Sequence, residues 1–372
     1  MDSPTPPRIC FLLGIDQRSG TNFLFNLIAT HPECVGPGPI WEDCFVRDAG
    51  RLRRFADDLY RQWNDAWEVE RTLGGPEALT ACLGDGIEAF LRRQLPGRAA
   101  RDPKSEGDAP TPRVLLTKSP SFVGLDYFCD LFPRAYLVLV VRDGRAVVES
   151  GVRSFDWDFE QAAYRWRDGA DRLLRFERNA QKDRANDPCP PVSSGDHSIG
   201  QSAEAIEDQG ALDAMRRGGE YLVVRYEELV ADRRGVLRRI FEYLGVDPDG
   251  CGEHELQSVG AIGSSELRER SGEVYWKGGG ETVDGFNPLE RFRDWPAARH
   301  ERFAWIAGPQ MRALGYETAP IPPGRLRQLK HRLTDGRTAT KTFFQKGRRA
   351  LTLGRKLIND RRRQATQPDL TD

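Results

Sequence analysis

Short, nearly uninterrupted apolar runs recur along the chain. They are Arg8–Ile15 (RICFLLGI), Arg113–Thr117 (RVLLT), Ala135–Arg142 (AYLVLVVR) and Tyr221–Arg225 (YLVVR). Continuous apolar runs of this length are typical of parallel strands that are covered by helices on both faces. The pattern therefore predicts four strands of a buried parallel sheet.

Between these runs, apolar residues recur at helical spacing. In 22–30 the apolar positions are Phe23, Leu24, Leu27 and Ile28, which would form one face of a helix. Further helices are predicted over 146–153, 160–178, 236–244 and 297–314, the last ending at Gly315. Strands that alternate with helices predict an α/β fold, a three-layer sandwich with a central parallel sheet.

Length and composition favour one large domain. The chain has 372 residues, of which 39% are hydrophobic, enough to build a large core and to exclude intrinsic disorder. We expect an α/β domain over 1–319 and a separate tail over 320–372. Residues 97–112 and 182–210 contain few large apolar side chains, so they are predicted to be surface insertions or disordered.

The start of the chain and its cysteines predict a cytoplasmic protein. The first residues, MDSPTPPRICFLLGI, lack the pattern of a secretory signal, and no apolar run approaches the roughly 20 residues that cross a bilayer. The seven cysteines lack metal-ligand spacing and fit reduced thiols better than a disulfide framework.

Charge is distributed unevenly. The tail has 14 Lys or Arg against 4 Asp or Glu, whereas the first 319 residues have 41 against 52. An acidic body excludes general nucleic-acid binding. Residues 325–363 combine leucine and phenylalanine with dense positive charge, which predicts one or two basic amphipathic helices broken near Gly336. Docking on the chain's own body, a solvated tail, and peripheral contact with an anionic membrane or an acidic partner all remain open.

A second group of aromatic side chains lies on a predicted helix early in the chain. Phe55, Tyr60, Trp63 and Trp67 alternate with several arginines. We expect an amphipathic helix that packs its aromatic side chains inward. The alternative is the wall of an acceptor cleft.

The segment Gly14–Asn22 (GIDQRSGTN) has the features of an anion-binding loop. A strand ends, the backbone turns and a helix begins near Thr21, so unpaired N–H groups and the positive helix end converge. Gly20 permits close approach of the backbone, Ser19, Thr21 and Asn22 add donors, and Arg18 adds a cation. The loop lacks the lysine of a nucleoside-triphosphate loop.

A second cation lies at the end of the run Ala135–Arg142. Ligands bind at the carboxyl ends of strands in open α/β sheets, so Arg142 is expected at the functional edge. Ser150 follows eight residues later on a predicted helix. An ion pair between Arg142 and Asp143 or Glu149 would be the purely structural alternative.

Together these segments resemble the sulfotransferases that use 3′-phosphoadenosine 5′-phosphosulfate. Arg18-Ser19-Gly20-Thr21 resembles the family's loop for the 5′-phosphosulfate, and Arg142 with Ser150 resembles its pair for the 3′-phosphate. Tyr226-Glu227-Glu228-Leu229 is similar to a segment whose tyrosine lies near the adenine. Lys277-Gly278-Gly279-Gly280 resembles the late loop that closes on the 3′-phosphate. Asn22 departs from the family's more frequent serine or threonine.

The resemblance implies a fold related to P-loop nucleotide kinases and transfer of a sulfuryl group to a hydroxyl or amine, without a metal. The acceptor, whether carbohydrate, peptide or small metabolite, is not specified. Where many small-molecule members have a catalytic histidine, this chain has Leu116-Thr117-Lys118-Ser119-Pro120, and Lys118 resembles the lysine that reaches the transferred group. In the carbohydrate, protein and bacterial branches a glutamate is the base. The resemblance therefore implies Glu42 as the base, with Asp43 as the alternative.

Two other functions are compatible with the same residues. One is an ATP-dependent kinase with a P-loop-like fold, which the missing lysine disfavours. The other is a sulfotransferase-like module that binds glycans or proteins without catalysis.

Overall fold

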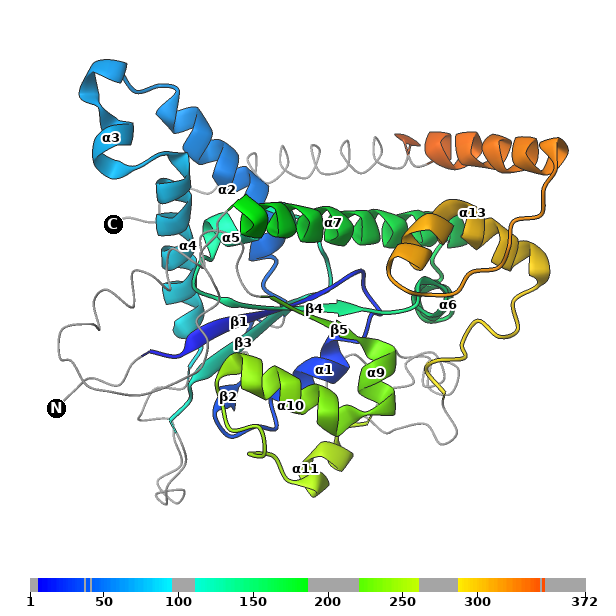
Figure 1. The fold of residues 1–372 in the computed structure, drawn as a ribbon, viewed down its shortest axis with the longest axis horizontal. Helices are drawn as coiled ribbons and strands as arrows, with labels where there is room; N and C mark the ends of the chain where they lie inside the picture. The colour runs from blue at the N-terminus through cyan, green and yellow to red at the C-terminus, as the bar shows by residue number, and fades with distance from the viewer. Residues whose placement is uncertain are drawn as a thin grey trace, which may run out of the picture.

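A five-stranded, wholly parallel sheet forms the centre of the part of the chain that the structure describes (Figure 1). The structure is a computed structural model, and it describes residues 6–36, 38–40, 42–95, 111–186, 221–260, 287–341 and 343–344. The strands are β1 (Arg8–Gly14), β2 (Cys34–Val35), β3 (Val114–Ser119), β4 (Tyr136–Val141) and β5 (Tyr221–Arg225).

The strand order β2-β3-β1-β4-β5 places β1 at the middle of the sheet. The chain leaves β1 toward β2 and β3 on one side and then adds β4 and β5 on the other. The direction of winding therefore reverses at β1. In open α/β sheets, ligands bind outside the carboxyl ends of the strands at such a reversal. A binding site is therefore expected at the loops after β1, β3 and β4.

Helices cover both faces of the sheet. The described helices are α1 (Thr21–Ile28), α2 (Phe45–Tyr60), α3 (Val69–Leu73), α4 (Pro76–Arg92), α5 (Phe128–Leu131), α6 (Gly144–Phe155), α7 (Phe159–Asn186), α9 (Tyr226–Ala231), α10 (Arg233–Leu244), α11 (Glu253–Ser258) and α13 (Ala297–Ala313), with short 3₁₀ turns at Asp65–Trp67 and Leu125–Tyr127 and a final helix over 325–341. In Figure 1, α7 and α13 lie on one side of the sheet and α1, α9 and α10 on the other. No described helix is both long and apolar enough to span a membrane.

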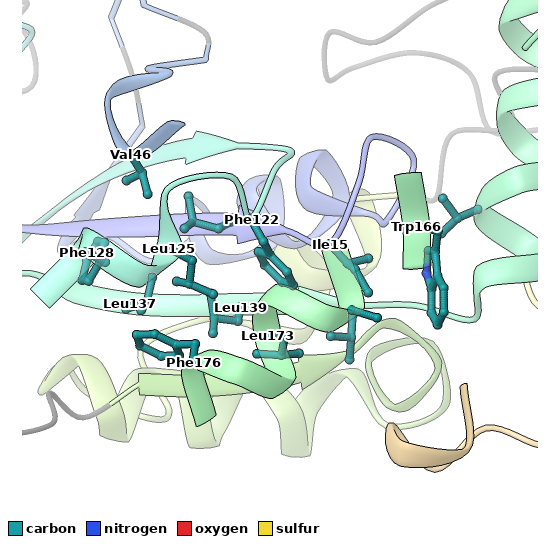
Figure 2. Packing of buried hydrophobic residues seen from close by; sticks show 14 of the residues in the cluster. Ile15, Val46, Phe122, Leu125, Phe128, Leu137, Leu139, Trp166, Leu173 and Phe176 are labelled. Carbon is teal, nitrogen blue, oxygen red and sulfur yellow. The ribbon is translucent and has the colours of Figure 1, made fainter. Parts of the chain in front are cut away.

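Side chains of β1 alternate between two apolar cores. Ile9, Phe11 and Leu13 join the cluster beneath α7, whereas Cys10 and Leu12 join the cluster with α1 and α10. All five are almost completely buried. Figure 2 shows the first cluster, in which Trp166 and Leu173 of α7 pack over the sheet. Burial on both faces explains why the strand sequences are continuously apolar.

The structure confirms the predicted fold class and most of its elements. All four predicted strands form, within two residues of the predicted ends, and so do the five predicted helices. The helix predicted over 160–178 is longer, because α7 continues through Asn186 into the predicted insertion 182–210. The sequence did not reveal β2, which has only two residues, or α4. Residues 97–110 and 187–210 of the predicted insertions lie outside the described residues.

The aromatic side chains of 55–67 do not pack into the main core as predicted. Helix α2 ends at Tyr60, and the side chains of Phe55 and Trp67 are 52% and 65% exposed. Tyr60 and Trp63 contact each other with ring centroids 4.8 Å apart, and the Tyr60 hydroxyl donates to the carbonyl of Gly74. Contacts within this projecting segment replace contacts with the main core.

The predicted helix break near Gly336 is also wrong. The helix over 325–341 passes through Gly336 without interruption. Gly336 is exposed and no described atom would touch a Cβ there. The cost of about 1 kcal/mol for one glycine inside a helix is small enough to be offset by the packing of its neighbours.

Helix α4 supplies a test of the packing. A Cβ added at Gly84 would lie 1.5 Å from the carbonyl oxygen of Leu131, which belongs to the backbone of α5. We expect Gly84→Ala to lower the free energy of unfolding by about 2 kcal/mol or more, because the two backbones must separate.

Gly86→Ala is the matched control in the same helix. No described atom lies within 4 Å of a Cβ at this position, so the substitution should raise the free energy of unfolding by about 0.5–1 kcal/mol. Urea denaturation of both variants measures the difference. Equal effects of the two substitutions would contradict the packing of α4 on α5.

Candidate active site

The loop between β1 and α1 is tightly folded around two glycines. A Cβ at Gly14 would lie 2.3 Å from the Ser19 hydroxyl oxygen, and Gly20 has a φ of 100° that favours glycine. Ser19 is fully buried, and its hydroxyl oxygen makes no hydrogen bond within the described residues. The loop leads directly into α1 at Thr21, whose first N–H groups have no partners inside the helix.

Arg142 lies directly after β4 and is 95% buried. Its guanidinium donates to the carbonyl of Arg18 over 2.9 Å and to the carbonyl of Pro288 over 2.5 Å. It forms no ion pair with any residue that the structure describes. A buried guanidinium held only by neutral carbonyls is costly unless an anion is available, so Arg142 is suited to bind one.

The acidic neighbours of Arg142 are engaged elsewhere. Asp143 caps α6 and pairs with Arg145 over 2.6 Å. Glu149 accepts from the indole of Trp295 over 2.7 Å and pairs with Arg299 over 3.2 Å. The ion pair that the sequence offered as a purely structural role for Arg142 therefore does not form.

Ser150 joins the loop after β1 to the end of β4. It is fully buried on α6, and its hydroxyl oxygen accepts from Nε of Arg18 and from the guanidinium of Arg291, each over 3.0 Å. Three guanidinium groups, those of Arg18, Arg142 and Arg291, thus converge on one small region. The structure brings Arg18 into contact with Ser150, although the resemblance had assigned the two residues to opposite ends of the donor.

Arg291 is a residue of this site that the sequence analysis missed. It is 91% buried and lies in an irregular segment before α13. The segment around it, Leu289-Glu290-Arg291-Phe292-Arg293, contains two arginines without a periodic pattern. Nothing in the sequence distinguished the buried arginine from its exposed neighbour Arg293.

The Tyr226 ring packs against the same group of residues. The guanidinium carbon of Arg142 lies 4.2 Å from the centre of this ring, which also contacts the ring of Phe23 on α1. A Cβ at Gly20 would lie 2.2 Å from this ring. The close approach of Gly20 to Tyr226 is a second reason why only glycine fits there, and it holds the loop against the start of α9.

The carboxyl end of β3 contributes a separate group of charged residues. The Lys118 side chain is fully buried, and its Nζ lies 3.8 Å from a carboxylate oxygen of Glu42, whose side chain is 40% exposed. Burial lowers the pKa of Lys118, although the nearby carboxylates of Glu42 and Asp43 oppose that shift. The structure therefore places Lys118 and Glu42 side by side.

Asp43 has a different position from Glu42. Its carboxylate oxygens accept from the Thr117 hydroxyl over 2.7 Å and from the backbone N–H of Phe45 over 2.9 Å. Burial raises the pKa of Asp43 to about 6, against the opposing effect of these hydrogen bonds. With both oxygens committed, Asp43 anchors the start of α2 to β3.

A cavity of about 420 Å³ connects the two groups of residues. It is lined by Gln17, Arg18, Thr21, Asn22, Glu42, Pro120 and Phe155. Both the loop after β1 and the carboxylate beside Lys118 face this one space. The described residues contain no cluster of three His, Cys, Asp or Glu side chains that could hold a metal ion. Lys277, Gly278 and Gly279 lie outside the described residues.

The raised pKa of Asp43 gives a prediction about stability. A carboxyl group whose pKa is higher in the folded state stabilises the fold below its ordinary pKa, and this stabilisation is lost as the pH rises through about 6. Relative to Asp43→Asn, wild-type protein should lose about 2–3 kcal/mol of unfolding free energy between about pH 4 and pH 7. Urea denaturation of both proteins across this range measures the loss, and parallel pH profiles would contradict it.

Comparison with known proteins finds a likeness to sulfotransferases. A model of the sulfotransferase family matches residues 10–187, which include the loop after β1, Glu42, Lys118, Arg142 and Ser150. Protein-tyrosine sulfotransferase A of Caenorhabditis elegans is 24% identical over 326 residues, covering 84% of this chain and 68% of that protein. Nodulation protein NoeE of Sinorhizobium fredii (strain NBRC 101917 / NGR234) is 27% identical over 66% of this chain, and the match spans about half (51%) of that protein.

Among solved structures, the sulfotransferase domain from the olefin synthase of Synechococcus PCC 7002 matches with a TM-score of 0.44 and 22% identity. The match covers 86% of this chain and 98% of that domain. The chain is therefore similar to the sulfotransferase family over residues 10–187, and both relatives are distant.

Proposed function

We propose that this chain is a sulfotransferase, which takes the sulfuryl group from 3′-phosphoadenosine 5′-phosphosulfate and transfers it to a hydroxyl or amine in the cavity that Arg18 and Glu42 line. The observation that carries the proposal is that Arg18 and Arg291 both donate to Ser150, while the buried Arg142 donates to the carbonyl of Arg18. Arg142 is held by carbonyl oxygens and the Tyr226 ring. Such a group of cations suits a doubly charged phosphate.

The residues present fit such a donor. Arg142, Ser150 and Arg291 would hold the 3′-phosphate, and Tyr226, whose ring packs against the Arg142 guanidinium, would lie next to the adenine. The buried Ser19 hydroxyl and the N-terminus of α1, which begins at Thr21, would hold the phosphosulfate end. Arg18 lies between the two ends, since it contacts Ser150 and also lines the cavity.

The donor, when bound, supplies a sulfuryl group whose bond to a phosphate oxygen breaks as a bond to the acceptor forms. Sulfuryl transfer resembles phosphoryl transfer, in which catalysis consists mainly of positioning and stabilisation of charge. Arg18 would neutralise the negative charge that accumulates on the phosphate oxygen. Lys118, from the opposite wall, would do the same for the oxygens of the transferred group.

Glu42 would accept the proton of the acceptor. Its carboxylate is partly exposed, lines the cavity and lies beside Lys118, whereas both Asp43 oxygens already accept hydrogen bonds from the protein. The exposed Glu42 carboxylate can receive a proton from a substrate. The anchored Asp43 carboxylate holds in place the segment that carries Glu42. A tyrosine-containing peptide is the first acceptor to assay, since one relative is named for that substrate.

Replacing Arg18 tests the role of the converging cations. We expect Arg18→Ala to lower kcat by about a hundredfold or more, because loss of a well-placed donor typically costs about 3–4 kcal/mol of barrier. Transfer of sulfate from labelled donor to the peptide measures kcat, and mass spectrometry confirms the added group. Arg51→Ala, which removes an exposed arginine of α2, is the control. A loss below about threefold for Arg18→Ala would contradict the role.

A pair of isosteric substitutions separates the two candidate bases. Glu42→Gln should lower kcat by about a hundredfold or more, because the acceptor loses its base. Asp43→Asn should lower kcat by less than about tenfold. If Asp43→Asn caused the larger loss, Asp43 would be the base.

A further inference from the structure

The helix over 325–341 docks on the body of the protein through its polar side. Asp335 accepts hydrogen bonds from Tyr164 of α7 over 2.5 Å and from Trp305 of α13 over 3.1 Å, and it pairs with Arg302 over 2.8 Å. Arg302 is buried and also pairs with Glu160 of α7. Asp335 therefore binds the helix to both α7 and α13.

Further contacts on the same side fix the rotation of the helix. His331 stacks on Trp305 with ring centroids 4.9 Å apart, and its Nε2 lies 3.0 Å from Glu301. Lys341 pairs with Asp158 over 2.6 Å. Thr338 is buried as well. Because these contacts are spread over three turns, the opposite side of the helix is fixed in its orientation toward solvent.

That outward side is apolar. Leu326, Leu329 and Leu333 are spaced three and four residues apart, so they form one stripe along the helix. Their side chains are 83%, 53% and 59% exposed. Phe343 and Phe344, which are also helical, are 75% and 65% exposed. A soluble helix usually buries such a stripe against its own domain, but here the polar side is docked and the apolar side is not.

Exposed cations flank the apolar stripe on both sides. At about 100° per residue, Lys330 and Arg337 lie along one edge of the stripe and Arg325 and Arg332 along the other. All four side chains are exposed, and none forms an ion pair with a residue that the structure describes. An apolar stripe between two rows of cations matches an anionic lipid surface, where apolar side chains enter the hydrocarbon boundary and cations meet the headgroups.

We propose that the helix over 325–341 binds the surface of anionic membranes, lying in the plane of the interface with Leu326, Leu329 and Leu333 inserted, while Asp335 and His331 keep it attached to the body of the enzyme. Charge favours this occupant over a second copy of the chain. A symmetric contact between two such stripes would place the rows of cations of the two copies opposite each other, and these cations would repel one another.

Vesicle binding by the full chain tests the proposal. The protein should sediment with vesicles of phosphatidylglycerol and phosphatidylcholine in equal parts and not with phosphatidylcholine alone. Raising the salt from about 50 mM to about 500 mM should release most of it, because exposed charges are screened. Binding that is the same for both vesicles, or absent from both, would overturn the proposal.

Substitutions separate the stripe from other exposed apolar side chains. The double variant Leu329→Glu with Leu333→Glu should weaken vesicle binding by about tenfold or more, and the control, Phe55→Glu with Leu73→Glu, replaces two exposed apolar side chains elsewhere and should not. Equal binding by the two variants would overturn the assignment.

Replacing cations tests the second feature. Lys330→Gln with Arg337→Gln should weaken binding to the anionic vesicles and reduce its dependence on salt. Analytical ultracentrifugation of the wild type and the Leu329→Glu, Leu333→Glu variant tests the competing occupant. A wild-type dimer that the variant converts to a monomer, together with no vesicle binding, would assign the stripe to a contact between copies of the chain.

Discussion

The position of Arg142 is the constraint on which the site depends. The buried strand β4 ends directly before it, so its guanidinium cannot reach bulk water, and the carbonyls of Arg18 and Pro288 and the ring of Tyr226 hold it in place. These contacts join the loop after β1, the start of α9 and the segment before α13. A bound anion would offset the cost of desolvating this cation. Ser150 extends the same network to Arg18 and Arg291.

A second buried cation, Lys118, lies beside the part of the cavity that Glu42 lines. Its position at the end of β3 puts it beside Glu42, while Asp43, one residue later, is bound to Thr117 and to the backbone of Phe45. Adjacent carboxylates thus have different environments: one is partly exposed and lines the cavity, and the other is buried with a raised pKa. Arg18 and Glu42 line the same cavity, so the proposed donor and acceptor would meet there.

Sequence reasoning predicted the features that are local in the chain. Continuous apolar runs specified β1, β3, β4 and β5, and the glycine-containing loop before α1 predicted an anion site there. The site residues that it missed or misplaced depend on contacts between distant segments. Arg291 meets Ser150 across 141 positions, and no local pattern distinguishes it from exposed arginines. Likewise, the composition of the tail indicated an amphipathic helix, but its docking through Asp335 could not be predicted, because it depends on Tyr164, Arg302 and Trp305 in two other helices.

Calorimetric titration of the wild type with adenosine 3′,5′-bisphosphate and with adenosine 5′-phosphate is the most direct test of the donor site. The two nucleotides differ only in the 3′-phosphate that the cations around Ser150 would bind. The bisphosphate is expected to bind at least about a hundredfold more tightly than adenosine 5′-phosphate, since each charge-assisted hydrogen bond contributes about 1.5–3 kcal/mol. The preference should disappear in Arg142→Gln. Equal affinity of the wild type for both nucleotides, or stronger binding of ATP than of the bisphosphate, would contradict the assignment of this site to the sulfuryl donor.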